Sequence, residues 1–268
     1  MPTETLSARP LPPAYRFAPL VVFAAATVYN FATSGDRRFE DDADSLVTAA
    51  GYAFSIWGVI FLGLLGFSVV LALGREPDTP PLRRAVLGLG IAGLASIAFV
   101  PISIGGDQVF GFLDVALHLV ALVYAYGQLR AHVRLAPDLP RGQRFWFYGP
   151  SMYLGWISAA TVIAASLALE QLGFRVSVQV ALVLALVLAF VLFAVGRTFL
   201  RQADAVVALT VAWALVGVAV EQVGFDVLQW VCYGGAATIV IAWLLRVSRG
   251  GYGFYATPGY YSRARPAG

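Results

Sequence analysis

The chain has no lysine, one cysteine and two histidines among its 268 residues. The single cysteine, Cys232, excludes a disulfide within the chain and a cysteine cluster for a metal ion. With no lysine, all 18 basic residues are arginines. They stand at the ends of apolar runs and form no basic face, so the sequence predicts no nucleic-acid partner.

Charge and catalytic motifs are scarce as well. Charged residues make up 12% of the chain, whereas 59% are hydrophobic and the mean hydropathy is +0.77. An ordinary soluble domain carries about twice that charge. The sequence has no zinc-ligand spacing, phosphate-binding loop or Ser-His-Asp pattern. We therefore expect a membrane protein without a metal site, and nothing in the sequence predicts an enzyme.

Eight apolar runs are each close to the roughly 20 residues with which a helix crosses a bilayer. None alternates as the strands of a membrane β-barrel do. The predicted fold is therefore an all-α, polytopic membrane helix bundle with eight transmembrane helices. The predicted spans are 17–33, 51–73, 85–104, 108–129, 149–168, 177–196, 204–221 and 227–247.

The arginines predict the orientation of these spans. If the N-terminus is cytoplasmic, only Arg37, Arg38 and Arg175 of the 18 arginines fall outside, as the positive-inside rule requires. Both termini then lie in the cytoplasm, with residues 1–14 as a short N-terminal segment and residues 249–268 as a disordered tail. Alternatively, residues 1–33 are a signal peptide, and its removal would leave seven helices.

Residues 51–67, GYAFSIWGVIFLGLLGF, carry two stripes along one predicted helix. Gly51, Ser55 and Gly58 share a face, and small residues at this spacing let a neighbouring membrane helix approach closely. The adjacent stripe is aromatic and consists of Phe54, Trp57 and Phe61. Its rings either face a ligand or pack against protein, and anchoring at the membrane interface is a further alternative.

Three blocks of the sequence resemble the tryptophan-rich sensory proteins of the TspO/translocator-protein group. Residues 51–58, GYAFSIWG, preceded by Asn30, are similar to the signature of that group's second helix. Residues 150–161, PSMYLGWISAAT, resemble its fifth helix. Residues 212–218, AWALVGV, resemble the helix that follows the core in its longer bacterial members.

This resemblance implies a five-helix core at 15–172 and a three-helix extension at 173–248, in the cytoplasmic (inner) membrane of a bacterium. In the core it implies a pocket for a porphyrin, haem or sterol-like molecule, lined by tryptophans of the second and fifth helices. By motif position these are Trp57 and Trp156, with Phe54, Phe61 and Tyr153 beside them. A bound tetrapyrrole is then the expected cofactor-like ligand. The bilayer and a second copy of the chain, as a homodimer, are the other expected partners.

The chain departs from the family pattern at three places. Thr48-Ala49-Ala50 stands where the family has a proline before the second helix. Ser96 and Phe99 occupy the positions of an Asn-x-x-Trp pattern, and Ala164 replaces an asparagine of the fifth helix. Two polar groups of the family's pocket are thus missing, so the identity of the ligand does not carry over with the motif.

Ionisable residues within the apolar runs are further candidates. Asp114 and His118 are four residues apart and share a helix face, and such groups near mid-membrane are functional candidates by default. They form either a structural pair or a proton-linked one, and His118 has a nitrogen that suits haem iron. His132 is predicted to be solvated in a cytoplasmic loop, and Glu170 and Glu221 to be exposed at helix ends.

Three functions follow from these features. The first is sensing through a bound planar, hydrophobic ligand, which the motifs favour. The second is small-molecule transport that uses Asp114 and His118, although no inverted repeat supports it. The third is light-dependent degradation of a porphyrin, which the resemblance suggests and the residues alone do not support. The opposite directions of the two Trp-bearing helices predict that Trp57 and Trp156 differ in depth by roughly 10 Å.

Overall fold

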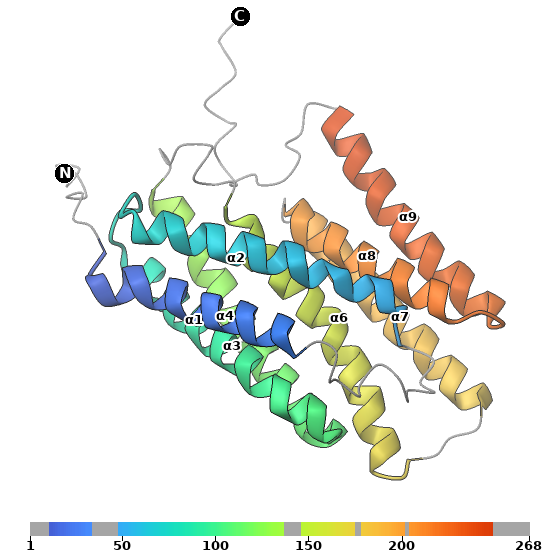
Figure 1. Cartoon of the computed structure of the whole chain (residues 1–268). Coiled ribbons are helices and arrows are strands. Elements are labelled where there is room, and N and C mark those ends of the chain that lie inside the picture. The colour runs from blue at the N-terminus through green and yellow to red at the C-terminus, as the bar shows by residue number, and fades with distance from the viewer. Residues whose placement is uncertain (1–10, 34–47, 137–145, 175–177, 202–203, 249–268) are drawn as a thin grey trace, which may run out of the picture.

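The computed structural model is a bundle of helices that pack side by side (Figure 1). It describes residues 11–33, 48–136, 146–174, 178–201 and 204–248. The predicted tail at 249–268, most of the predicted N-terminal segment, and Arg37, Arg38 and Arg175 lie outside the described residues. The elements are α1 (Pro13–Ala32), the 3₁₀ helix η2 (Gly51–Ser55), α2 (Ile56–Ala72), α3 (Pro80–Gly105), α4 (Gln108–Leu135), α6 (Tyr148–Gln171), α7 (Val178–Arg201), α8 (Ala205–Glu221) and α9 (Asp226–Ser248).

Local sequence signals set both ends of α3 and the start of α4. The hydroxyl of Thr79 accepts the N–H of Leu82 and caps the start of α3, as an N-cap threonine does. At its other end α3 stops at Gly106, whose φ of 73° is left-handed and suits glycine. Asp107 then caps α4 by accepting the N–H groups of Val109 and Phe110. The two apolar runs are therefore separate helices, as predicted.

Among the described residues, five helical segments are long and apolar enough to cross a membrane: η2 with α2, α3, α4, α6 and α9. This finding makes the chain an all-α, multi-pass membrane protein, and the count of eight spans stays a prediction. Several helices extend beyond the predicted spans; α3, for example, begins at Pro80 and α4 ends at Leu135. The apolar run marks where the bilayer ends, and a helix can continue past that level.

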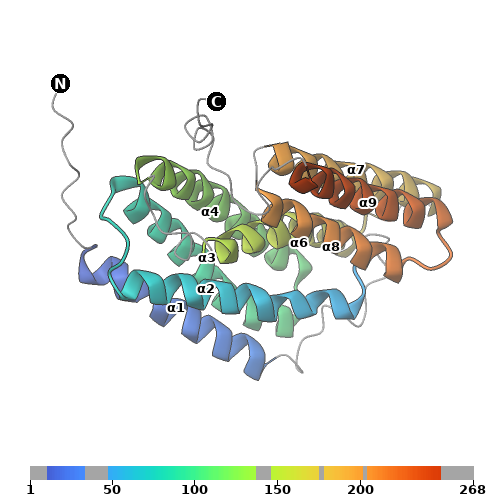
Figure 2. The ribbon, with the colours of Figure 1, turned by 90° about the horizontal axis from the view of Figure 1, so that it is seen from above.

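The helices form two groups that meet at α6. Seen from above, α1 to α4 lie on one side and α7 to α9 on the other (Figure 2). α6 packs against α2 and α4 of the first group and against α8 of the second, and α8 also contacts η2. The helices α7 to α9 are therefore packed onto the first helices through α6 and η2.

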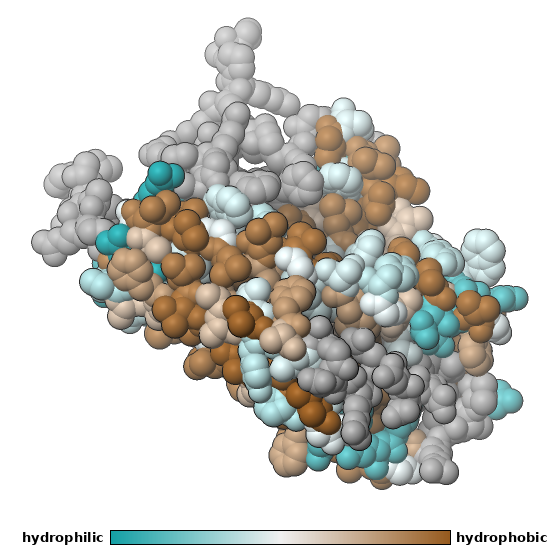
Figure 3. Space-filling model, viewed as in Figure 1, coloured by the Kyte–Doolittle hydropathy of each residue, from teal (hydrophilic) through white to brown (hydrophobic). Residues whose placement is uncertain are grey.

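Apolar side chains cover much of the surface. Brown residues lie over α1 and α2, and hydrophilic residues gather toward the ends of the helices (Figure 3). Large apolar side chains on other helices are also exposed, among them Val120, Phe190 and Trp230, at 69%, 65% and 75%. A surface of this kind suits contact with lipid tails.

Candidate functional site

Three aromatic rings from two parts of the chain meet near the start of α2. The ring of Phe54 lies edge-to-face on Trp156, with 5.4 Å between the centroids. Trp57 lies edge-to-face on the same indole at 6.5 Å. Such perpendicular contacts match the electrostatic preference of aromatic rings. The second-helix and fifth-helix motifs therefore meet in space, with Trp156 at their junction.

Two other predicted site residues stand behind these rings and do not line the cavity. Phe61 stacks on Trp57 at 5.4 Å and is 2% exposed. Tyr153 contacts the edge of Trp57 at 5.7 Å, is 1% exposed, and donates its hydroxyl to the carbonyl of Ala92 at 3.1 Å. Neither residue lines the cavity in this structure, and their contact with a ligand stays a prediction. Each sits one turn away from a tryptophan and supports it instead.

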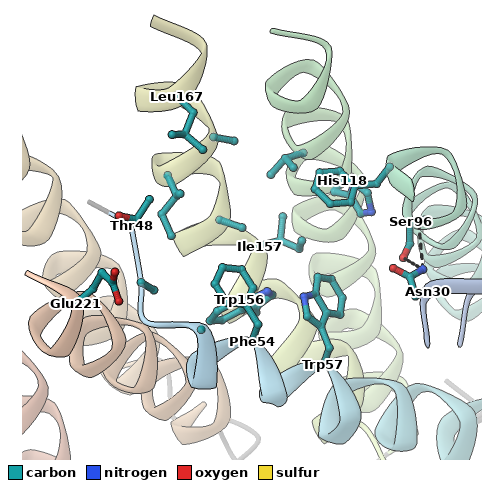
Figure 4. Close-up of a pocket in the computed structure, with 17 residues that line it drawn as sticks. Asn30, Thr48, Phe54, Trp57, Ser96, His118, Trp156, Ile157, Leu167 and Glu221 are labelled. Atoms are coloured by element: carbon teal, nitrogen blue, oxygen red, sulfur yellow. Dashed lines mark hydrogen bonds between the residues drawn. The ribbon is translucent and has the colours of Figure 1, made fainter. Parts of the chain in front are cut away.

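The rings border a cavity of about 150 Å³ that α1, α3, α4, α6 and α8 also surround. Most of its lining is apolar (Figure 4). The lining residues are Asn30, Thr48, Ala49, Gly51, Phe54, Trp57, Ser96, Phe99, Val115, His118, Trp156, Ile157, Ala160, Ile163, Ala164, Leu167 and Glu221.

Polar groups lie at two ends of the cavity (Figure 4). At one end the amide nitrogen of Asn30 donates to the backbone oxygen and the hydroxyl of Ser96, at 3.2 and 3.3 Å. His118 lies beside this pair, and Thr48 and Glu221 lie at the opposite end. An amide from α1 thus stands against Ser96, the position where the family pattern has an asparagine. Asn30 entered the sequence analysis only as part of a motif, and the spacing of residues did not predict its contact with α3.

The predicted difference in depth between the two tryptophans is wrong. Their centroids are 6.5 Å apart, so their depths cannot differ by 10 Å. Trp156 stands 15 residues before the end of α6 at Gln171, which is roughly 22 Å at 1.5 Å per residue. The η2–α2 segment therefore begins well away from that end of α6, beside α8, where the N–H of Ala50 donates to the carbonyl of Gly217 just before η2 starts.

The predicted packing stripe of Gly51, Ser55 and Gly58 is also wrong. All three residues are exposed, and a Cβ atom on either glycine would meet nothing within 4 Å. Residues 51–55 form a 3₁₀ helix, with three residues per turn, so the α-helical spacing used to align the stripe does not hold there. The close contact of helix 2 lies further along, where a Cβ on Gly63 would come within 2.7 Å of the Gly149 backbone.

Asp114 and His118 are in contact, as their spacing indicates. Nδ1 of His118 lies 3.0 Å from the backbone oxygen of Asp114 and 3.1 Å from its Oδ2. One ring N–H cannot serve both acceptors, and the alignment favours the backbone oxygen, which leaves the buried Oδ2 without a hydrogen bond. His118 lines the cavity and Asp114 does not. The pair thus presents an imidazole, held by its Nδ1, to any ligand.

α8 supports the cavity through η2. The N–H of Ala50 donates to the carbonyl of Gly217 at 3.0 Å, and the indole N–H of Trp213 donates to the carbonyl of Ala53 at 3.0 Å. Gly217 permits this approach, because a Cβ there would come within 2.8 Å of the Ala53 Cβ. The third motif of the sequence therefore packs against the first.

Comparison with protein families identifies the family of this chain. The TSPO-like protein family matches residues 15–245. The chain belongs to the TSPO-like protein family. No match was found among curated proteins or among solved structures. The family match runs from α1 into α9, so it includes both the predicted core and the predicted extension.

In this TSPO-like protein, a buried histidine lies away from the cavity. His132 is 0% exposed, and its Nε2 lies 3.0 Å from Oε2 of Glu76 while its Nδ1 lies 2.8 Å from the Thr79 hydroxyl. Phe147 stacks on the imidazole at 6.3 Å. The prediction of a solvated loop histidine is therefore wrong. The apolar run ends near residue 129, but α4 continues and carries His132 into contact with the segment between α2 and α3.

Proposed function

We propose that this TSPO-like membrane protein binds a planar, hydrophobic ligand, of the porphyrin, haem or sterol-like class, against Phe54, Trp57 and Trp156. The observation that carries the proposal is the meeting of these rings at a cavity inside the bundle. Ligand sites are concave and mostly apolar with a few polar groups that orient the ligand. The apolar walls and the polar ends of this cavity follow that pattern.

The volume limits how such a ligand is held. A cavity of about 150 Å³ accepts a ligand about the size of benzene, and sites for larger ligands usually measure about 300–1,000 Å³. A macrocycle would therefore insert one edge between the aromatic rings, with the rest extending beyond the enclosed space. The residues present fit this edge: flat rings contact its face, and His118 or Asn30 can hydrogen-bond a polar atom on it.

A sensory role requires only that the ligand binds. We therefore propose no chemical conversion of the ligand. The transport alternative needs Asp114 and His118 along one path, and only His118 lines the cavity. Binding at the aromatic rings therefore remains the function that the geometry supports best.

The test is a titration of protoporphyrin IX into the purified protein in neutral detergent, followed by the shift of the porphyrin's main absorption band. Aromatic contacts contribute about 0.5–1.5 kcal/mol each beyond burial, so Trp57→Ala or Trp156→Ala should weaken binding about three- to tenfold. Trp57→Phe should weaken it less, because a ring remains. Trp230→Ala removes an indole that is 75% exposed on α9 and serves as the control. Unchanged affinity in the Trp57→Ala, Trp156→Ala double variant would contradict the proposal.

A further inference from the structure

One nitrogen of His118 is left for a ligand. Histidine is the side chain whose charge changes near neutral pH, and His118 lines the cavity. Its Nδ1 lies 3.0 Å from the backbone oxygen of Asp114. Its Nε2 makes no hydrogen bond to the described residues, and it is not enclosed by them. The imidazole is therefore anchored at one nitrogen and open to the cavity at the other.

Asp114 fixes which ring nitrogen carries hydrogen. A backbone carbonyl oxygen only accepts hydrogen bonds, so Nδ1 must carry the hydrogen that it donates to Asp114. The other neutral form of the ring, with its hydrogen on Nε2, would turn a bare Nδ1 toward this oxygen and toward Oδ2, which is 3.1 Å away. Nε2 is therefore an acceptor while the ring is neutral, and it becomes a donor only when the ring takes up a second proton.

The neighbouring polar groups at this end of the cavity already bond to protein. The amide nitrogen of Asn30 donates to the carbonyl of Ala26 at 2.9 Å and to the two oxygens of Ser96 at 3.2 and 3.3 Å. The hydroxyl of Ser96 is also hydrogen-bonded to the side chain of Tyr153. A ligand oxygen that needs a donor at this end therefore finds it best at Nε2 of His118.

The ionisable groups that face the imidazole come from two helices. Asp114 lies on the same helix, α4, and Tyr153 of α6 faces the ring edge-to-face at 5.8 Å. The described residues that line the cavity from α1, η2, α2 and α3 include no ionisable side chain. Glu221, exposed at the end of α8, lines the opposite end of the cavity (Figure 4). Because Tyr153 also contacts Trp57 at 5.7 Å, the imidazole is within one ligand's reach of the aromatic rings.

We infer that His118 links the binding of a carboxylate-bearing ligand to the uptake of one proton, so that such a ligand binds more tightly as the pH falls. An imidazolium donates its Nε2–H to the carboxylate, whereas the neutral ring presents a lone pair that repels it. The balance is the same if the carboxylate holds the proton and donates it to a neutral Nε2. The inference rests on the proposed function, because it assigns the regulation of the same cavity. Porphyrins and haem, with two carboxylate side chains each, belong to this class of ligand.

The experiment titrates protoporphyrin IX and its dimethyl ester into the whole protein in neutral detergent, from about pH 6.5 to about pH 8.5. The ester has the same ring and lacks the free carboxylates. In the wild type, affinity for protoporphyrin IX should fall by up to about tenfold per pH unit as the pH rises, because the complex holds one more proton than its separate components. Affinity for the ester should not change with pH.

His118→Gln is the deciding variant, because a glutamine amide can donate to a carboxylate but takes up no proton. Its affinity for protoporphyrin IX should lose most of the pH dependence. The chain's other histidine, His132, is the same in both proteins, so its titration cannot account for the difference. Size-exclusion profiles at each pH show that the variant is folded.

The outcomes separate the two proposals. Equal pH dependence of protoporphyrin IX binding in the wild type and in His118→Gln would overturn the inference and leave the pocket standing. If the Trp57→Ala, Trp156→Ala double variant binds both porphyrins as the wild type does, the pocket itself is wrong.

A second measurement needs no variant. Calorimetric titration of the wild type in buffers of different ionisation enthalpy counts the protons taken up with each bound porphyrin. About one proton is expected for protoporphyrin IX and about none for the ester, and equal uptake with the two porphyrins would also overturn the inference.

Discussion

At the scale of single residues, Asp204 joins three helices with one carboxylate. Its Oδ1 accepts the N–H groups of Val206 and Val207 at the start of α8, at 3.0 and 3.2 Å. Its Oδ2 accepts the hydroxyls of Tyr126 on α4 and Ser151 on α6, at 2.9 and 3.0 Å. Asp204 is 1% exposed, so these four bonds replace the water that the charge would otherwise need.

Substitution of Asp204 should therefore be costly. Asp204→Ala removes a helix cap and leaves two buried hydroxyls without their acceptor, which should lower the free energy of unfolding by about 3 kcal/mol. Asp204→Asn keeps one acceptor oxygen and should lose about half as much. Asp226→Ala, in the exposed first turn of α9, should cost no more than about 1 kcal/mol. Thermal unfolding in detergent measures all three, and equal stability of Asp204→Ala and Asp226→Ala would refute this account.

Motifs predicted which aromatic residues meet, but they did not predict which of them face the cavity. Phe54, Trp57 and Trp156 line it, while Phe61 and Tyr153 stand behind Trp57. The neighbouring helices determine which side of an indole borders the cavity. The spacing of residues along one helix cannot predict it.

At the scale of elements, α2 and α6 are in close backbone contact at a pair of glycines. A Cβ on Gly149 would lie 2.4 Å from the carbonyl carbon of Gly63 and 2.6 Å from its oxygen. Backbone atoms cannot turn aside as a flexible side chain can. This contact therefore determines the distance between α2 and α6, the two helices that carry Trp57 and Trp156.

The glycines of helix 2 and α6 should thus differ sharply in tolerance. Gly149→Ala must push α6 from α2 and should lower the free energy of unfolding by about 2–3 kcal/mol. Gly58→Ala adds its methyl group in open space and should leave stability unchanged or raise it by up to about 1 kcal/mol, because alanine favours a helix. Thermal unfolding of both variants is the measurement. Comparable losses at the two positions would restore the predicted stripe of Gly51, Ser55 and Gly58.

Hydropathy predicted where every α-helix of the described chain lies, because an apolar run of the right length has few other folds in a membrane. It did not predict η2, since a 3₁₀ turn and an α-helical turn share the same composition. It also placed the end of the fourth helix too early, at 129 instead of Leu135, because polar residues such as His132 continue a helix whose partners are protein.

At the scale of the whole molecule, the distribution of arginines predicts how the bundle is oriented in the membrane. The arginines favour a cytoplasmic N-terminus, and eight crossings would return the C-terminus to the same side. A reporter active only in the cytoplasm should therefore give signal when fused after Gly268, and none when inserted within residues 35–47. An inactive reporter after Gly268, in a fusion shown to be intact and folded, would contradict an even number of crossings with a cytoplasmic N-terminus.

The bond between Gln222 and Thr48 spans 174 residues of the chain, and this has a consequence for biogenesis. At roughly 5–20 residues per second, synthesis of the intervening chain takes about 9–35 s. During that interval the first helices have already left the ribosome, while η2 still lacks the helix that holds it. The cavity is therefore completed only near the end of translation, and a chain released before α8 is made would expose Ala50 and Ala53 with their hydrogen bonds unmade.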